Sequence, residues 1–502
     1  MQGSEYVELD GNNLDLKKFR KVVFQGIPVK ISEHSVEKVR SGRNNIEKMI
    51  RDGKTIYGVN TGFGSLLNKK IRDDEADRLQ INLIRSHSAG FGEPLSIEKM
   101  RAVLLVRINS LVRGYSGCTM DLVNAAIQFL NRNVHVFIPE FGSVGSSGDL
   151  APLSHLCLAI IGEGEIIVDE KRVNAGEIEK LYGIKPYKLK EKEALAFING
   201  TAAITGVGMV EVSRALDNLN LATGSAIVAM DSLSSTKKAF SPWVLGARNQ
   251  PGQLAIGKIL YEKLEDSGST DKGDRERIQD AYSIRCTPQV FGAVLDTINY
   301  VKGVLVNEMN STTDNPLVND VEYISAGNFH GEPVALACDF LAIALVDLGN
   351  MIERRIARIT DTSLSGLPAF LVKNSGLNSG YMIAQYVAAA LCNRNKILVY
   401  PGSADTIPTC ANQEDHVSMG ANAAQKLTEI NNNVHRIIAT EYVLGVQAMD
   451  LADLDFGKFS NKIRKIVREK IEFLAEDRPI YRDMDEMENL MEKYLLGICS
   501  FL

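Results

Sequence analysis

Helical periodicity in the second half of this chain constrains its fold more than any other feature. From Thr201 onward, apolar residues recur at the spacings that bring them to one face of an α-helix. Residues 333–360 form one such stretch and residues 417–448 form another. Helices of this length bury their apolar stripes by packing against one another, so the pattern predicts a helical bundle.

The first part of the chain has a different pattern. Short helical patterns alternate with Gly-rich turns as far as about residue 140, and residues 164–173 alternate apolar and polar side chains as a β-hairpin does. Strands and helices do not alternate regularly, which argues against a doubly wound parallel sheet. We therefore expect a mainly α protein with a smaller α+β region at residues 1–199 and a bundle of long helices at residues 200–502.

Composition excludes several classes of partner. The chain has 502 residues, and its 56 Lys and Arg against 62 Asp and Glu give a net charge of −6 without a long basic run. A nucleic-acid partner is therefore not expected. The N-terminus lacks a basic segment followed by an apolar one, and the longest apolar passages are short or carry charges: residues 150–162 and 333–349. Neither a secretory signal nor a membrane-spanning helix is expected.

Cysteine spacing and the absence of common motifs exclude several cofactors. The seven cysteines are odd in number, widely spaced and without a C-x-x-C pair, so we expect reduced thiols, no structural zinc and a cytoplasmic protein. The chain has no G-x-x-x-x-G-K-[ST] phosphate loop, no G-x-S-x-G nucleophile elbow and no H-E-x-x-H zinc motif. Neither a metal nor a nucleotide cofactor is predicted.

One Gly/Ser-rich segment has unusual chemistry: Gly142-Ser-Val-Gly-Ser-Ser-Gly-Asp-Leu-Ala-Pro-Leu153. One interpretation is purely structural, namely a turn that leads into a helix capped by Asp149, with Pro152 in its first turn. The other is chemical. Glycine has no Cβ, so the backbone can bend tightly enough for the Gly148 nitrogen to attack the Ser146 carbonyl. Loss of two waters would then leave a five-membered ring with an exocyclic methylidene, and the segment alone leaves both interpretations open.

This segment resembles the cofactor-forming segment of the aromatic amino acid ammonia-lyases and aminomutases, which use 4-methylideneimidazole-5-one (MIO). The resemblance runs from about Tyr57 to Met419 and is closest to the histidine-specific members. The family usually has Ala-Ser-Gly, whereas this chain has Ser146-Ser147-Gly148, a change at the residue that contributes mainly its carbonyl. The resemblance implies that MIO forms autocatalytically from these three residues. The substrate amine would then add to the methylidene carbon derived from Ser147, which makes the enzyme the electrophile in covalent catalysis.

The resemblance also implies roles for residues around this group. Tyr57 would remove the β-proton of the substrate, which requires neighbours that favour the phenolate, because a phenol has a pKa of about 10. Arg285 would bind the substrate carboxylate with its planar guanidinium group. Other contacts to the substrate or to MIO would come from Asn199, Gln279, Tyr282 and Phe329. Taken singly, Tyr57 could equally be a half-buried aromatic in a turn, Arg285 a structural ion pair and Asn199 a helix cap.

Two positions bear on which amino acid is the substrate. His87 occupies the selectivity position of the family, where a polar ring suits either an imidazole or a phenol, so histidine and tyrosine both stay open. Glu414 lies in Ala411-Asn-Gln-Glu-Asp-His-Val-Ser-Met419, which resembles the histidine-specific form. A carboxylate can accept an imidazole N–H, stabilise its cation or take a proton from the substrate amine. The structural alternative is an exposed residue at the start of a helix, where a negative charge is favoured.

The expected reaction is therefore the non-oxidative elimination of ammonia from L-histidine to give trans-urocanate. Two alternatives within the family are a tyrosine ammonia-lyase and an MIO-dependent 2,3-aminomutase. An alternative of another class is a catalytically silent helical assembly protein in which the ring does not form. The resemblance further implies a homotetramer whose core is the helical region 200–502, with each active site drawing residues from three subunits.

Overall fold

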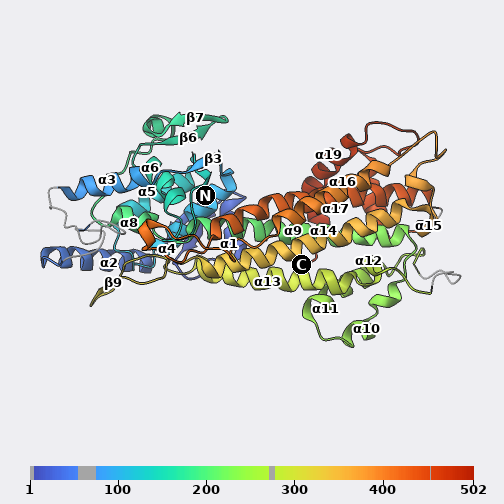
Figure 1. Cartoon of the computed structure of the whole chain (residues 1–502), viewed down its shortest axis with the longest axis horizontal. Coiled ribbons are helices and arrows are strands. Elements are labelled where there is room, and N and C mark those ends of the chain that lie inside the picture. Colours follow the sequence, from blue (N-terminus) through green and yellow to red (C-terminus); the bar gives the residue numbers. More distant parts are fainter. Residues whose placement is uncertain (1–4, 55–60, 62–74, 271–277, 453) are drawn as a thin grey trace. The chain divides into compact units, whose positions relative to one another are not determined.

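Four long helices dominate the computed structural model of this chain (Figure 1), so the expectation of a mainly α protein is confirmed. They are α9 (Ala202–Ser232), α13 (Thr287–Met309), α14 (Glu332–Thr360) and α17 (Gly420–Leu451). The last two match the stretches predicted at 333–360 and 417–448 to within three residues. The structure describes residues 5–54, 61, 75–270, 278–452 and 454–502.

The chain forms two compact units, and neither is one continuous stretch of sequence. The first unit consists of Met1–Ser213, Val301–Asp339 and Pro401–Gln425, and the second consists of Arg214–Tyr300, Phe340–Tyr400 and Lys426–Leu502. Apart from the step between Tyr400 and Pro401, each boundary falls inside one of the four long helices. The boundary expected between residues 199 and 200 lies within the first unit.

The first unit is built around α4 (Ile97–Leu111), whose residues from Met100 to Leu111 are all buried. The helices α1, α5 and α8 pack against it, and its polar side chains are buried together with its apolar ones. The Ser96 side chain caps its start by accepting a hydrogen bond from the Lys99 backbone. The helices that lie wholly in this unit are α1 (Leu16–Val23), α2 (Glu33–Arg51), α3 (Ala76–His87), α4, α5 (Met120–Asn131), α6 (Leu150–Ile160), α7 (Ile178–Tyr182) and α8 (Glu193–Ile198).

Small sheets complete the first unit. The hairpin predicted at 164–173 is confirmed as β6 (Glu165–Val168) and β7 (Lys171–Asn174), which pair antiparallel with Val168 opposite Lys171. The two turn residues between them, Asp169 and Glu170, have positive φ angles of 47° and 62°, as a two-residue hairpin turn requires. The other strand pairs are β1 (Val7–Leu9) with β2 (Val29–Ile31), β3 (Phe91–Pro94) with β5 (Pro139–Phe141), β4 (His135–Val136) with β6, and β8 (Leu317–Val318) with β9 (Tyr323–Ile324).

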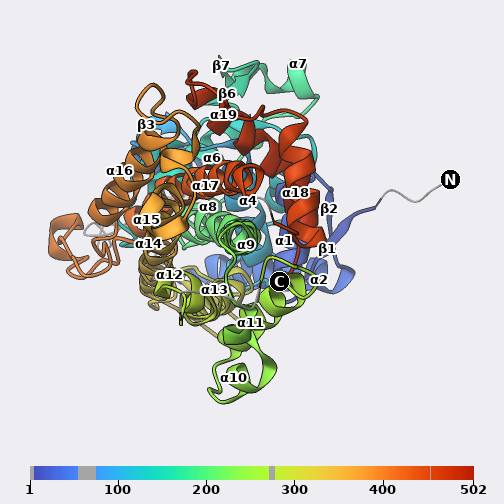
Figure 2. The same ribbon diagram turned by 90° about the vertical axis from the view of Figure 1, so that its right-hand side faces the viewer.

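In the second unit, α9 and α17 lie at the centre of the helices that surround them (Figure 2). The Asn218 side chain donates to the Asn431 carbonyl at 3.0 Å, and the fully buried Arg355 of α14 pairs with Glu441 of α17 at 2.5 Å. The remaining helices of this unit are α10 (Pro242–Gly246), α11 (Pro251–Lys263), α12 (Tyr282–Arg285), α15 (Thr362–Ser365), α16 (Met382–Leu398), α18 (Lys458–Arg468), α19 (Tyr481–Leu490) and α20 (Leu496–Ile498).

Among the described residues, α14 is the one helix long and apolar enough to cross a membrane, with a mean hydropathy of 1.8 over its most apolar window. However, 61% of that window is buried inside the protein, as is typical of the core helix of a globular protein. The burial of α14 is accounted for by packing within the protein itself.

Candidate active site

The turn before α6 is held in a conformation that only glycine tolerates at position 148. Gly148 has a φ of +74°, and a Cβ added there would lie 2.3 Å from the Gly200 oxygen and 2.4 Å from its nitrogen. Gly148 and Gly200 form a β-bridge, which the Asp149 N–H extends by donating to the Gly200 carbonyl at 2.7 Å. The backbone at Gly148 therefore has the left-handed conformation that glycine allows in a tight turn.

Asp149 occupies the N-cap position of α6, as the structural interpretation expects, but its side chain does not cap that helix. Its two oxygens instead accept from the Ser143 hydroxyl at 2.9 Å and from the Ile204 N–H at 2.8 Å. Burial raises the pKa of this carboxyl to about 6, although these hydrogen bonds favour the ionised form. The side chain thus ties the turn to the start of α9.

Ser147 and Glu414, which are 267 positions apart in sequence, meet in the first unit. The Ser147 hydroxyl donates to Glu414 Oε1 at 2.8 Å, and the Thr409 hydroxyl donates to Oε2 at 2.5 Å. Backbone hydrogen bonds also join Thr409 and Glu414 in both directions, at 3.0 Å and 3.3 Å. Both carboxylate oxygens are therefore bound, and one of them faces the serine that would become the electrophile.

The loop between Thr409 and Glu414 explains this placement. Cys410, Ala411 and Asn412 all have positive φ angles, between 49° and 66°. Left-handed backbone at three successive residues other than glycine is unfavourable and is typical of functional sites, where surrounding contacts impose it. Thr409 was not among the predicted residues, because no sequence pattern signals a loop of this kind.

His87 ends α3 and is partly buried. Its Nδ1 lies 2.9 Å from the Leu83 carbonyl, so this nitrogen carries the proton and Nε2 is left as an acceptor. Burial lowers the pKa of the ring, and this effect outweighs the opposing influences of the Leu83 hydrogen bond and the Glu414 charge. Burial therefore favours the neutral form of the His87 imidazole.

Asn199 is the C-cap residue of α8 and is 3% exposed. Its Oδ1 atom has no hydrogen-bond partner among the residues that the structure describes. A buried amide oxygen without a partner is costly, and it is expected where a bound group completes the site. The constrained Gly148 and the Ser147–Glu414 contact fit an MIO group, whereas this free acceptor would face a donor on a bound substrate, because the MIO ring carries no N–H.

Phe329 is half-buried in the turn that precedes α14, where the His330 N–H donates to the Gly327 carbonyl at 3.0 Å. His330 Nδ1 accepts from the Glu332 N–H at 3.4 Å, and Nε2 lies 3.3 Å from the His416 carbonyl. His330, Glu332 and His416 place possible metal-binding atoms within 4.8 Å of one another. However, both ring nitrogens of His330 already face backbone groups, so its hydrogen bonding is satisfied without a metal.

The remaining predicted residues divide into two groups. Gln279, Tyr282 and Arg285 belong to the second unit, where the Arg285 guanidinium lies 4.8 Å from the centre of the Tyr282 ring. Gln279 and Tyr282 are exposed, and the buried Arg285 Nε has no hydrogen-bond partner among the described residues. Tyr57 lies outside the described residues, so its predicted role stays a prediction.

Comparison with known proteins places the whole chain in one group. The family model for aromatic amino acid lyases matches residues 14–469. The chain is similar to a probable histidine ammonia-lyase of Thermoplasma acidophilum, with 52% identity over 487 residues that cover 97% of this chain and 98% of the relative. It is 41% identical to a histidine ammonia-lyase of Streptococcus gordonii, over 97% of this chain and 96% of that one.

Solved structures agree with the sequence comparisons. The crystal structure of histidine ammonia-lyase from Trypanosoma cruzi matches with a TM-score of 0.91 and 40% identity, covering 99% of this chain and 95% of that one. Tyrosine aminomutase from Streptomyces globisporus matches with a TM-score of 0.94 and 33% identity, covering 99% and 98%. The long-helix architecture expected from the sequence is therefore that of the lyases and aminomutases.

Proposed function

This chain belongs to the aromatic amino acid lyase family and is a carbon–nitrogen lyase, and on that premise we propose that it eliminates ammonia from L-histidine to give trans-urocanate. The observation that carries the proposal is the Glu414 carboxylate, held 2.8 Å from the Ser147 hydroxyl. A carboxylate at this point can bind an imidazole N–H or an ammonium group, and it would gain nothing from a phenyl ring. The histidine-specific relatives support the same substrate.

The cofactor would be MIO, made from Ser146, Ser147 and Gly148, the last of which is bridged to Gly200. When present, this group supplies an electrophile for the substrate amine, which is otherwise a poor leaving group. The residues of the chain supply binding and proton transfer. Neutral His87 can accept a hydrogen bond from the substrate ring at Nε2, while Asn199 offers a buried acceptor.

The carboxylate and the β-carbon of the substrate require further residues. Arg285 would bind the carboxylate, since a planar guanidinium group forms paired hydrogen bonds with it. Tyr57 would remove the β-proton, and a phenolate in that role requires a site that lowers its pKa. Glu414 would take or return the proton of the departing amine. In this proposal Arg285 binds the substrate carboxylate, Tyr57 is the base, and the Ser147–Glu414 pair acts on the amine.

A direct assay tests this function. Purified protein is incubated with L-histidine and, separately, with L-tyrosine, while the ultraviolet absorbance of the conjugated acid is followed and the products are separated. We expect urocanate and ammonia from histidine, and no turnover in a Ser147→Ala variant. Coumarate formed from tyrosine would instead indicate a tyrosine ammonia-lyase. A β-amino acid product would indicate an aminomutase. A peptide containing residues 146–148 that keeps the mass of both waters would indicate the catalytically silent alternative.

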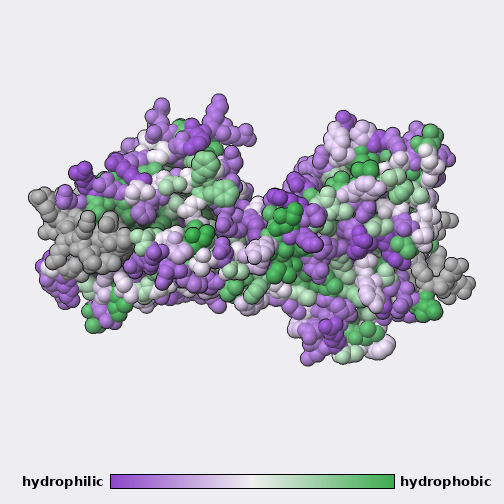
Figure 3. Space-filling view, in the orientation of Figure 1, coloured by the Kyte–Doolittle hydropathy of each residue, from purple (hydrophilic) through white to green (hydrophobic). Residues whose placement is uncertain are grey.

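We also propose that the protein is a cytoplasmic homotetramer whose active sites combine residues from different subunits. Apolar side chains at the surface support association: Phe340 and Ile343 of α14 are 42% and 51% exposed, and Ile383 and Val387 of α16 are 52% and 51% exposed. Figure 3 shows apolar groups among hydrophilic ones on one face of the second unit. The seven cysteines are all free, which supports a reducing compartment.

A further inference from the structure

We propose that Glu414 has a second function, as the acid that protonates the hydroxyl group leaving Ser147 while the cofactor forms, and that Thr409 positions it for this step. The proposal rests on the proposed function, because it assumes that the 146–148 segment loses two waters. It assigns a chemical role to a contact that exists before any substrate binds.

The geometry fixes the carboxyl group in one orientation. Glu414 Oε1 faces the Ser147 hydroxyl at 2.8 Å, while Oε2 is held at 2.5 Å by Thr409. The two backbone hydrogen bonds between Thr409 and Glu414 keep the ends of their loop together. Because Thr409 binds Oε2, the carboxyl group directs Oε1 toward Ser147.

The chemistry of dehydration requires an acid at this position. Loss of water from Ser147 breaks the Cα–H and Cβ–Oγ bonds, and the electron pair of the Cα–H bond becomes the new Cα=Cβ bond. The electron pair of the Cβ–Oγ bond leaves with the oxygen, and hydroxide is a poor leaving group. The step requires the protonated form of Glu414, in which the 2.8 Å hydrogen bond runs from the carboxyl group to the Ser147 oxygen. The proton of Glu414 then lets this oxygen leave as water, the Cα proton passes to solvent water, and Glu414 is reprotonated from solvent. The second water carries the former Ser146 carbonyl oxygen and the N–H hydrogens of Gly148 and Ser147, as the Gly148 nitrogen bonds to the Ser146 carbonyl carbon and the bond from that carbon to the Ser147 nitrogen becomes C=N.

The other carboxyl group of this segment is engaged elsewhere. Asp149 is completely buried, and its two oxygens accept from the Ser143 hydroxyl and the Ile204 backbone. Among the described residues, Glu414 is the carboxyl group that contacts the Ser147 hydroxyl. The structure therefore separates the two acids: Asp149 holds the turn, and Glu414 faces the atom that must leave.

The test measures cofactor formation itself and not turnover. Wild-type and variant chains are synthesised in a cell-free reaction and quenched at intervals, and the peptide containing residues 146–148 is analysed by mass spectrometry for the loss of two waters. A general acid typically contributes at least about a hundredfold, so we expect Glu414→Gln to slow this loss by about a hundredfold. The amide keeps the size of the side chain, replaces one acceptor oxygen by an NH2 donor, and cannot serve as the acid.

Three further variants control for structural effects. Asp415→Asn removes a neighbouring exposed carboxylate and should form the cofactor at the wild-type rate. Thr409→Val should slow the loss of water, whereas Thr409→Ser, which restores the hydroxyl, should recover it. Rescue by serine separates positioning of Glu414 from a general effect on folding. Circular dichroism confirms that each variant is folded.

The outcomes separate this proposal from the proposed function. If folded Glu414→Gln loses both waters at the wild-type rate but does not turn over histidine, Glu414 acts on substrate alone and the proposal fails. If the wild-type chain loses no water, the proposed function fails as well. If Glu414→Gln does not fold, Thr409→Val decides, because wild-type cofactor formation in that variant would overturn the positioning argument.

Discussion

At the scale of single residues, backbone conformation decides what the site can hold. The sequence predicted that Ser146-Ser147-Gly148 could close into a ring because glycine bends tightly, and the structure supplies the reason it must be glycine, in the backbone of Gly200. The resemblance predicted Glu414, whose placement beside Ser147 is now explained. Thr409 could not be predicted, because its contact depends on a left-handed loop that no residue pattern announces.

Two glycine-to-alanine substitutions should have opposite effects on stability. At Gly148, the added Cβ meets the Gly200 backbone and the φ of +74° is unfavourable for alanine, so we expect the free energy of unfolding to fall by roughly 2 kcal/mol or more. Gly303 lies inside α13, and a Cβ there meets nothing within 4 Å. Gly303→Ala should therefore raise the free energy of unfolding by about 1 kcal/mol. Denaturant titration measures both, and equal effects would refute the conformational argument.

At the scale of elements, local periodicity was enough for the long helices and for the β6–β7 hairpin. Both depend on neighbours in sequence, and helix propensity and turn chemistry act over a few residues. The pairing of β1 with β2 and of β4 with β6 joins distant segments, so no local pattern predicts it. The irregular segment between α18 and α19 was likewise beyond prediction, because its order depends on buried polar contacts.

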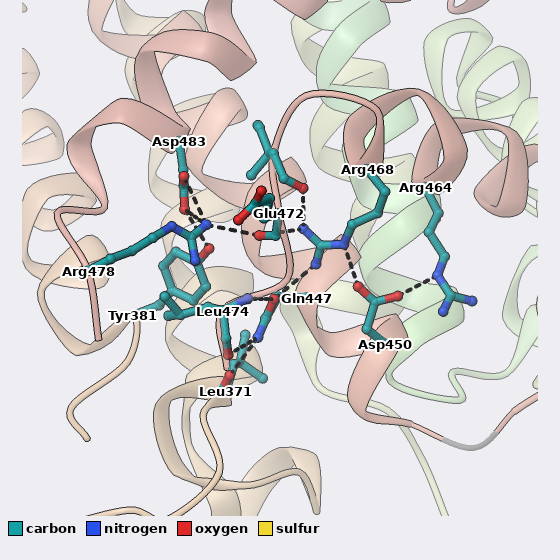
Figure 4. Close-up of polar contacts among 11 residues, drawn as sticks. Leu371, Tyr381, Gln447, Asp450, Arg464, Arg468, Glu472, Leu474, Arg478 and Asp483 are labelled. Carbon is teal, nitrogen blue, oxygen red and sulfur yellow. Dashed lines mark hydrogen bonds and ion pairs between the residues drawn. The ribbon is translucent and has the colours of Figure 1, made fainter. Parts of the chain in front are cut away.

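Buried Gln447 of α17 contacts that segment through several hydrogen bonds (Figure 4). The Gln447 amide donates to the Leu371 and Leu474 carbonyls at 3.0 Å each, and its oxygen accepts from the Leu474 N–H at 3.1 Å and from Arg468 at 2.9 Å. Gln447→Leu would leave these buried groups unpaired, which should cost about 2–4 kcal/mol. Thermal unfolding measures the loss, and exposed Gln250→Leu is the matched control, expected within about 0.5 kcal/mol of wild type. A loss no larger than that of the control would show that solvent replaces these bonds.

At the scale of the whole molecule, the sequence predicted two sequential regions, whereas contacts group the chain into two interleaved units. The difference has a physical origin. Each long helix supplies packing surface to more than one neighbourhood along its length, so compactness does not follow chain order. The residues assigned to the site divide accordingly: Ser147, Asn199 and Glu414 belong to the first unit, and Gln279, Tyr282 and Arg285 to the second.

This division makes the shared active site of the proposed tetramer testable. A Ser147→Ala variant lacks the electrophile, and an Arg285→Met variant lacks the group that would bind the substrate carboxylate, so each alone should be nearly inactive. If each site draws these residues from different subunits, mixed oligomers contain some sites with both residues intact. Co-expressing the two variants with different affinity tags and purifying the doubly tagged oligomer should then recover a measurable fraction of wild-type urocanate production. Light scattering should give the mass of four chains. A doubly tagged tetramer as inactive as its parents would show that each site is complete within one chain.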